Sequence, residues 1–454
     1  MGGPYEPTAD SLRTHAVPDW YHDAKLGIFV HWGLYSVPGW ADPESDHAYA
    51  EWYPYYMYRE ESETAAAHRE RYGETVGYLD FADDWTAENW DPERWATLFA
   101  DVGARYVVLT AEHHDGIPLW DSRYAEHTAA TLGPGRDLVA DCCAAVREAG
   151  LRFCPSFHAG LNYFDPAEGG PDGHPDYDVG ADGLFGDAGF AEDVGPGPEY
   201  VDYMNAKHRE LIRRFDPDLL WFDTPQAGPE HLRARELVAE FYNRAAAQGR
   251  AVAVNDRAAR GPMHADFRTP EYDSYDTVRE EKWEACRGLG RSFGFNRAEG
   301  TEHTLSTREL VHLLVDVVSK NGNLLLNVGP RADGTIPEVQ RRPLEGLGEW
   351  LDRYGEAVFG TRPWVAAEDA VASVPVRYTR REGTLYGVCL DWPGESLSLS
   401  LAGGGDPGGV RAARHVGGDA VPVSTTATGV DLSLPADPPE PAPAYAFSLD
   451  GAAG

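Results

Sequence analysis

Lysine is scarce in this sequence of 454 residues: only Lys25, Lys207, Lys282 and Lys320 occur, and nearly all other basic residues are arginine. Asp and Glu together number 74 against 39 Lys and Arg, which gives a formal net charge of −35. An acidic, lysine-poor surface repels polyanions, which argues against nucleic acids and anionic membranes as partners. Halophilic proteins use the same strategy, so we expect a salt-adapted source, with an acidic protein of a GC-rich mesophile as the alternative.

Long apolar runs and paired cysteines are also missing. No stretch approaches the ~20 apolar residues that a membrane-spanning helix needs. The N-terminus, MGGPYEPTADSLRTHAVPDWY, has no basic stretch followed by an apolar one, so no secretory signal is visible. The five cysteines are an odd number and show no CxxC spacing. They indicate buried thiols of a cytoplasmic protein rather than disulfides or a metal site.

From about residue 26 to 330, short apolar runs alternate with amphipathic stretches. The predicted strands are 26–33, 104–116, 151–160, 217–224, 251–256 and 323–329, and the predicted helices are 92–103, 136–150, 200–215, 229–249 and 306–322. Such alternation with short connections implies parallel strands joined by helices. We therefore predict an α/β fold, with a TIM-like (β/α) barrel as the larger domain over residues 1–365. No GxGxxG follows the first strand, and no cofactor is expected.

After about residue 365 the helical pattern disappears. Short alternating runs such as TLYGVCLDW and AYAFSLDG follow one another, separated by Gly and Pro. This pattern predicts a small C-terminal antiparallel β-sandwich over residues 366–454.

Polar residues gather where the predicted barrel strands end. They are His31, His113, His114, His158, Asp223 and the run Asn255–Asp256–Arg257. The carboxyl ends of barrel strands carry the chemistry of this architecture. Neighbours in a strand point to opposite faces, so we expect His113 and His114 to hydrogen-bond a ligand rather than to share a metal ion. No HExxH motif is present, and no metal is expected.

Asp223 directly follows an apolar run, in LLWFDT (219–224). Most aspartates at strand ends cap turns or helices, but this one would face the pocket of a barrel. An ionised carboxylate there can act as a nucleophile on a sugar if a protonated carboxylic acid lies opposite. The candidates for that acid are Asp256, Asp266, Glu271 and Glu284.

Six longer motifs occur in order along the chain. They are WYHDAKLGIFVHWGLYSVPGW, AEWY, FADDWTAENWDPERWATLFADVGARYVVLTAEHHDG, LLWFDT, EKWEACRGLGRSFGFN and NGNLLLNVGPRADGTIP. Over about residues 17 to 365 the chain therefore resembles the α-L-fucosidases of glycoside hydrolase family 29. The resemblance implies a barrel followed by a β-sandwich, and retaining hydrolysis of terminal α-L-fucosides through a covalent glycosyl-enzyme. The implied partner is a fucosylated oligosaccharide or glycoconjugate, and a homo-oligomer is left open.

The resemblance also assigns roles to residues. Asp223 matches the family's nucleophile, and Glu271 in FRTPEY matches its acid/base. Glu284, beside Trp283 and a helix-like stretch, is the alternative acid/base and otherwise a structural carboxylate. The positions that match those binding the sugar are His31, Glu51, Trp52, His113, His114, Trp221 and, as a pocket arginine, Arg257.

The chain departs from the family's pattern at one strand end. Many members carry Tyr-Tyr-Ser where this sequence has FCPSFHAG (153–160), so we expect either that His158 or Tyr163 replaces a ring-binding tyrosine or that the sugar subsite differs. The segment 165–198, rich in Gly, Asp and Pro, is interpreted as an acidic solvated loop. Two alternatives to fucoside hydrolysis stay open: a barrel hydrolase for another sugar such as an α-L-galactoside, and a non-catalytic sugar-binding protein.

Overall fold

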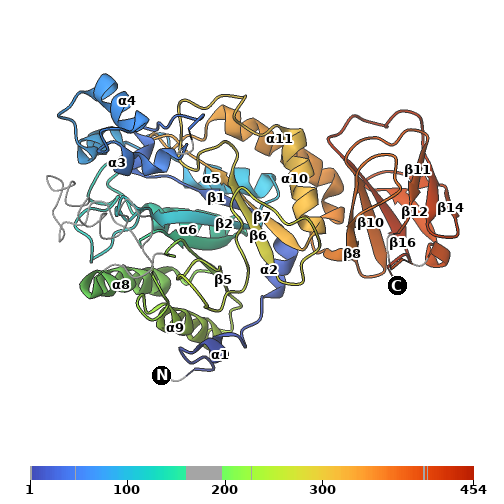
Figure 1. Ribbon diagram of the computed structural model, residues 1–454, viewed down its shortest axis with the longest axis horizontal. Helices are drawn as coiled ribbons and strands as arrows, with labels where there is room; N and C mark the ends of the chain where they lie inside the picture. Colours follow the sequence, from blue (N-terminus) through green and yellow to red (C-terminus); the bar gives the residue numbers. More distant parts are fainter. Residues whose placement is uncertain are drawn as a thin grey trace.

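The computed structural model describes residues 3–45, 48–159, 197–225, 227–401, 404–405 and 407–453. Figure 1 shows two lobes: a larger one of mixed helices and strands that holds the N-terminus, and a smaller one of strands that holds the C-terminus. Tyr163 lies outside the described residues, as does the segment 165–198 except for its last two residues.

Seven parallel strands form the sheet of the larger lobe, in the order β5-β4-β3-β2-β1-β7-β6. They are β1 (Leu26–Val30), β2 (Tyr106–Glu112), β3 (Arg152–Phe157), β4 (Leu219–Phe222), β5 (Ala253–Val254), β6 (Trp283–Gly288) and β7 (Gly322–Val328). Nearly all of their residues are buried, as expected for a parallel sheet covered on both faces. The six predicted strands are confirmed. The helix-like interpretation after Trp283 was wrong, because WEACRG is too short a run for its period to distinguish helix from strand.

One irregular segment, residues 267–271, connects the two edges of this sheet. Asn255, just after β5, forms a parallel bridge with Phe267, and Glu271 forms one with Cys286 of β6. The segment thus takes the place of a strand in the barrel wall without forming a regular one. Main-chain pairing with β6 thereby fixes the position of Glu271.

The main helices of this lobe are α5 (Pro92–Asp101), α6 (Leu138–Glu148), α8 (Pro198–Phe215), α9 (Ala234–Ala247), α10 (Thr307–Ser319) and α11 (Glu338–Tyr354). Shorter helices, α1 (Ala9–Leu12), α2 (Asp19–Ala24), α3 (Tyr53–Tyr56) and α4 (Glu63–Tyr72), precede them. Local signals fix where helices begin: the Asp91 side chain accepts from the Arg94 N–H at α5, and Ser306 and Glu309 form a capping box at α10. The five predicted helices are confirmed, although α9 begins later than expected, and α11 is additional.

The smaller lobe consists of antiparallel strands in two sheets, ordered β13-β12-β16-β10-β9-β8 and β11-β15-β14. The strands are β8 (Arg362–Glu368), β9 (Val376–Arg381), β10 (Thr384–Cys389), β11 (Ser396–Leu399), β12 (Ala412–His415), β13 (Ala420–Val421), β14 (Val423–Thr425), β15 (Val430–Ser433) and β16 (Tyr445–Asp450). Both sheets contribute apolar side chains, such as Leu385, Leu397, Leu432 and Phe447, to one buried core. The predicted β-sandwich is confirmed, and the division at residue 365 stays a prediction.

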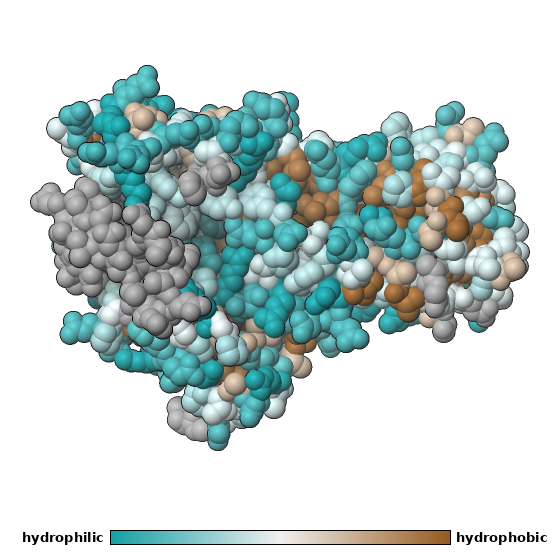
Figure 2. Space-filling view, viewed as in Figure 1, coloured by the Kyte–Doolittle hydropathy of each residue, from teal (hydrophilic) through white to brown (hydrophobic). Residues whose placement is uncertain are grey.

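The hydrophilic surface of the larger lobe agrees with the acidic composition of the chain. Figure 2 shows hydrophilic side chains over most of the larger lobe on this face, whereas hydrophobic ones gather over the smaller lobe and beside it. All five cysteines are buried and free, as predicted. Within the described ranges, none of the helices combines the length and the apolar character needed to cross a bilayer.

Candidate active site

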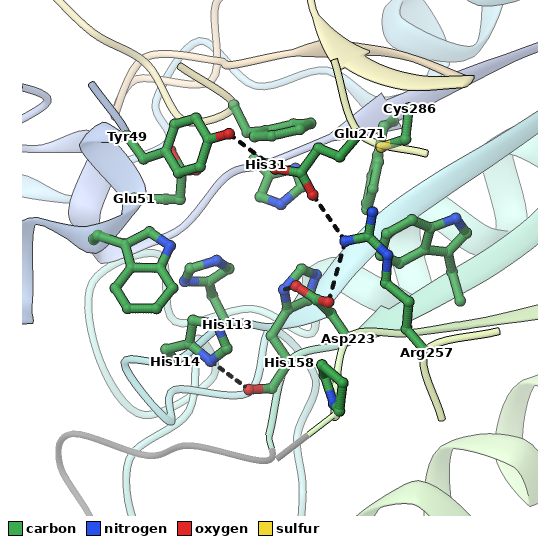
Figure 3. A pocket seen from close by; sticks show the side chains of 15 residues that line it. His31, Tyr49, Glu51, His113, His114, His158, Asp223, Arg257, Glu271 and Cys286 are labelled. Carbon is green, nitrogen blue, oxygen red and sulfur yellow. Dashed lines mark hydrogen bonds and ion pairs between the residues drawn. The ribbon is translucent and has the colours of Figure 1, made fainter. Parts of the chain in front are cut away.

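A pocket of about 240 Å³ lies where the parallel strands end. This volume lies below the ~300–1,000 Å³ of pockets for drug-sized ligands, which suits one sugar ring better than an oligosaccharide. The pocket is lined by Phe29, His31, Tyr49, Glu51, Trp52, His113, His114, His158, Trp221, Asp223, Pro225, Arg257, Glu271, Cys286 and Phe293. All the residues to which the resemblance assigned a catalytic or sugar-binding role line it except Glu284 (Figure 3). Asn255, Asp256 and Asp266, which the sequence analysis also considered, are absent from the lining.

Asp223 follows the last residue of β4, and its N–H donates to the carbonyl of Phe157 at 2.7 Å. Its Oδ1 lies 3.3 Å from Arg257 Nη1, and its Oδ2 lies 3.3 Å from His158 Nδ1. Burial alone would raise the pKa of Asp223. The positive charge of Arg257 and the contact with His158 outweigh it, so the pKa lies well below its usual range. The carboxylate is therefore ionised and oriented.

Arg257 connects the two proposed catalytic carboxylates. Its Nη1 donates to Glu271 Oε2 at 2.8 Å and to Asp223 Oδ1 at 3.3 Å (Figure 3). Both distances are measured from the same nitrogen, so Glu271 Oε2 and Asp223 Oδ1 are no more than about 6 Å apart. This is near the ~5–5.5 Å between the carboxyl groups of retaining glycosidases. Thr269 holds the guanidinium in place by accepting from Nε at 2.9 Å through its hydroxyl and from Nη2 at 2.8 Å through its carbonyl.

Glu271 has a second partner that sequence reasoning missed. The Tyr49 hydroxyl donates to Glu271 Oε1 at 2.9 Å. Burial and the neighbouring Glu271 carboxylate raise the pKa of Tyr49, so the phenol stays protonated and remains a donor. Tyr49 lies two residues before Glu51, and no pattern around it distinguished it from a core tyrosine.

Four histidines line one side of the pocket: His31 follows β1, His113 and His114 follow β2, and His158 follows β3. The expectation that His113 and His114 point to opposite faces was wrong. Strand β2 ends at Glu112, so the alternation of a strand no longer applies, and both rings line the pocket with centroids 4.5 Å apart.

Hydrogen bonds hold two of these rings in defined tautomers. His31 Nδ1 lies 2.7 Å from Asn327 Oδ1, and His114 Nδ1 lies 2.7 Å from the carbonyl of His158. Both acceptors are carbonyl oxygens, so each Nδ1 carries the proton and each Nε2 keeps a lone pair. Burial lowers the pKa of His31 and His113, and burial with the nearby His158 lowers that of His114 to about 3. These rings are neutral and can accept hydrogen bonds from hydroxyl groups.

Glu51 and Trp52 reach the pocket from a short 3₁₀ turn, Ala50–Trp52. Glu51 Oε2 accepts from the Gly294 N–H at 2.7 Å and from the Ser292 hydroxyl at 3.2 Å. Burial exceeds the effect of these bonds and raises the pKa of Glu51 to about 7. The Trp52 ring lies 4.9 Å from that of His114, which places an aromatic wall beside the imidazoles.

Glu284 lies behind the pocket wall. Its carboxylate is fully buried and accepts from Trp221 Nε1 at 2.9 Å and from the hydroxyls of Tyr21 and Tyr106 at 2.7 and 2.5 Å. It thus supports Trp221, which lines the pocket, from the barrel interior. Two further candidates for the acid are engaged elsewhere: Asp256 accepts from Thr269, and buried Asp266 contacts His15, His264 and Tyr242.

The pocket lies at the strand ends of a barrel, and an arginine joins two carboxylates across it, with imidazoles and indoles around them. This arrangement is that of a glycoside hydrolase. A family model described as Alpha-L-fucosidase matches residues 2–356. The chain belongs to the alpha-L-fucosidase family.

Known relatives agree with this assignment. Tissue alpha-L-fucosidase of Rattus norvegicus is 32% identical over 405 residues, which cover 87% of this chain and 80% of the rat protein. Alpha-L-fucosidase of Branchiostoma floridae is 32% identical over 396 residues, covering 86% and 82%. Among solved structures, Thermotoga maritima alpha-fucosidase in complex with a mechanism-based inhibitor is 38% identical, with a TM-score of 0.83, and the match covers 98% of this chain and 100% of the other.

Proposed function

We propose that this member of the family releases terminal α-L-fucose with net retention, with Asp223 as nucleophile and Glu271 as general acid and base. The bridge formed by Arg257 carries the proposal, because it keeps the two carboxylate oxygens within about 6 Å, closer than the ~6.5–9.5 Å of inverting pairs. A pocket of about 240 Å³ supports removal of a single terminal sugar from a fucosylated oligosaccharide or glycoconjugate.

In the first step, an Asp223 oxygen attacks the anomeric carbon while Glu271 gives its proton to the glycosidic oxygen, whose bond to that carbon breaks. The aglycone leaves as an alcohol, and the sugar stays as an ester of Asp223. In the second step, Glu271 takes a proton from water, the water oxygen attacks the anomeric carbon, and the ester bond to Asp223 breaks. Two inversions give net retention.

The other residues that line the pocket would recognise the substrate. The lone pairs of His31 and His114 accept hydrogen bonds from sugar hydroxyls, and Trp52 and Trp221 offer apolar faces to the ring. Arg257 keeps Asp223 ionised for attack. A cytoplasmic location and a salt-adapted source belong to this proposal as predictions from composition.

The nucleophile is tested with the Asp223→Gly variant. We expect hydrolysis of an aryl α-L-fucoside to be nearly abolished, and added azide to yield the β-L-fucosyl azide, because a small anion can enter the vacated space and attack from the same face. Ordinary turnover by this variant would reject the assignment. The wild type is also assayed with an aryl α-L-galactoside, and faster hydrolysis of this substrate than of the fucoside would favour the other sugar specificity. Binding of fucose by the wild type without any hydrolysis would favour a non-catalytic protein.

The acid/base is tested with a matched pair, Glu271→Gln and Glu284→Gln. Loss of the acid should slow fucosides with poor leaving groups far more than activated aryl fucosides, which need little protonation. We expect this leaving-group dependence for Glu271→Gln only. Glu284→Gln should instead lower the free energy of unfolding by about 1–3 kcal/mol, because a buried acceptor of three hydrogen bonds is disturbed. The opposite pattern would make Glu284 the acid.

A further inference from the structure

We propose that the pocket also holds a binding site for a divalent transition metal of the zinc type, formed by His31, His113 and His158. One ligand atom from each of these buried side chains lies within 4.8 Å of the others. Figure 3 shows the three imidazoles gathered on one side of the pocket, beside Asp223. Imidazole nitrogen is a preferred ligand of zinc. Because these three residues line the pocket proposed to bind the sugar, the metal would compete with substrate.

The spacing of the rings fits one ion. Their centroids are 5.6 Å apart for His31 and His113, 5.3 Å for His31 and His158, and 4.7 Å for His113 and His158. Three imidazoles bound tetrahedrally at ~2.0–2.1 Å hold their centroids about 5 Å apart. Rotation of the side chains would therefore bring the nitrogens to the ion without displacement of β1, β2 or β3.

The nitrogens are also available. Asn327 engages His31 Nδ1 at 2.7 Å, and Ser156 Oγ lies 2.5 Å from His158 Nε2, which leaves the other nitrogen of each ring for a ligand. Within the described part of the chain, Nδ1 of His113 is buried without a hydrogen-bond partner. Nδ1 of His158 faces Asp223 Oδ2 at 3.3 Å, so a metal ion bound there would lie between His158 and this carboxylate. Histidines that bind metals are typically held in this way, with the second nitrogen bonded to an oxygen of the protein.

The surrounding charge favours a cation. The ionised Asp223 lies 3.3 Å from His158 and offsets part of the ion's charge. A formal net charge of −35 attracts cations to the whole protein.

Calorimetric titration of the chelator-stripped full chain with Zn²⁺ tests this inference. The chain offers a matched control, because His15, His264 and Asp266 form a second set of ligand atoms within 4.8 Å, away from the pocket. We compare His158→Gln with His264→Gln. Removing a residue that only supports a metal ligand weakens metal binding roughly 10–100-fold, so removing an imidazole ligand itself should weaken zinc binding by more than that. We expect this larger decrease in zinc affinity for His158→Gln and an unchanged affinity for His264→Gln.

His113→Gln provides a second variant if His158→Gln does not fold, as judged by its thermal unfolding. Saturable binding of one Zn²⁺ that either pocket variant weakens supports the inference. Binding that is lost in His264→Gln alone, or the absence of saturable binding, overturns it. Zinc binding is measured without substrate, so a failure to hydrolyse fucosides would reject the proposed function and leave this inference standing. A separate titration tests whether zinc and sugar compete for the pocket. L-fucose, at concentrations shown to bind, should weaken the affinity for zinc. An unchanged zinc affinity would show that the two sites do not overlap.

Discussion

His158 Nδ1 lies 3.3 Å from Asp223 Oδ2, at the ends of the neighbouring strands β3 and β4. Arg257 Nη1 lies at the same distance from the other carboxylate oxygen. Both oxygens of the proposed nucleophile thus face a nitrogen, which fixes the plane of the carboxylate. His158 lies at the strand end where many family members carry tyrosine, and the Ser156 hydroxyl contacts its second nitrogen.

Replacing His158 should impair attack more than binding. In His158→Phe the ring keeps its bulk but loses the contact with Asp223, so we expect kcat to fall about tenfold, the lower end of the ~1.5–3 kcal/mol of interactions with a charged group. Steady-state kinetics with an aryl α-L-fucoside measure this. Ser156→Ala, which disturbs only the far nitrogen, should have a smaller effect. Equal losses in both variants, or a change in KM alone, would contradict the role in orienting Asp223.

Arg257→Gln should shift the pH dependence of hydrolysis. Burial raises the pKa of Asp223, and Arg257 is the main group that lowers it. Without the guanidinium charge the pKa of Asp223 rises, so the carboxylate becomes protonated at a higher pH. The acidic limb of the profile of kcat/KM against pH should move upward. An unchanged limb with a uniformly lower rate would show that Arg257 acts only by position.

Glu51 should make the protein less stable as the pH rises. Burial raises its folded-state pKa from an ordinary 4.5 to about 7. Its contribution to stability is therefore present below pH 4.5 and is lost as the pH rises through 7, because the folded state then gives up a proton that it binds more tightly than the unfolded state.

The variant Glu51→Gln cannot ionise and keeps an acceptor for the Gly294 N–H. Relative to the wild type, it should gain up to ~3 kcal/mol of unfolding free energy between pH 4 and pH 8, at ~1.36 kcal/mol per pKa unit. Urea denaturation at both pH values measures the difference. The same difference between variant and wild type at both pH values would rule out this linkage.

Salt should stabilise the protein if the acidic surface reflects adaptation to salt. The Debye length falls from about 10 Å at 0.1 M to about 3 Å at 1 M, which screens the mutual repulsion of the 74 acidic residues. We expect Tm and activity both to rise with KCl over this range. Sucrose, which carries no charge, serves as the control for general solute effects. A flat or falling Tm in KCl would instead favour the mesophilic alternative.

Part of the site could be predicted and part could not. His31 and Asp223 directly follow apolar runs, so their placement at the mouth of a barrel follows from the strand pattern. Glu271 could be singled out only by resemblance, because it lies in an irregular segment whose position depends on bridges to β5 and β6. Tyr49 had no local signal, since its function as a donor to Glu271 depends on a contact 222 residues away.

The sequence by itself determined the classes of structure: alternating strands and helices gave the barrel, and period-two runs gave the β-sandwich. That polyanions are not partners stays a prediction from the acidic composition. Only the tertiary structure decided which of two glutamates faces the pocket. Glu284 belongs to β6 and Glu271 pairs with this strand, yet Glu284 points into the barrel interior toward two tyrosines, and Glu271 contacts Arg257. The direction of a side chain depends on pairing between distant segments, and such pairing leaves no periodic trace in the sequence.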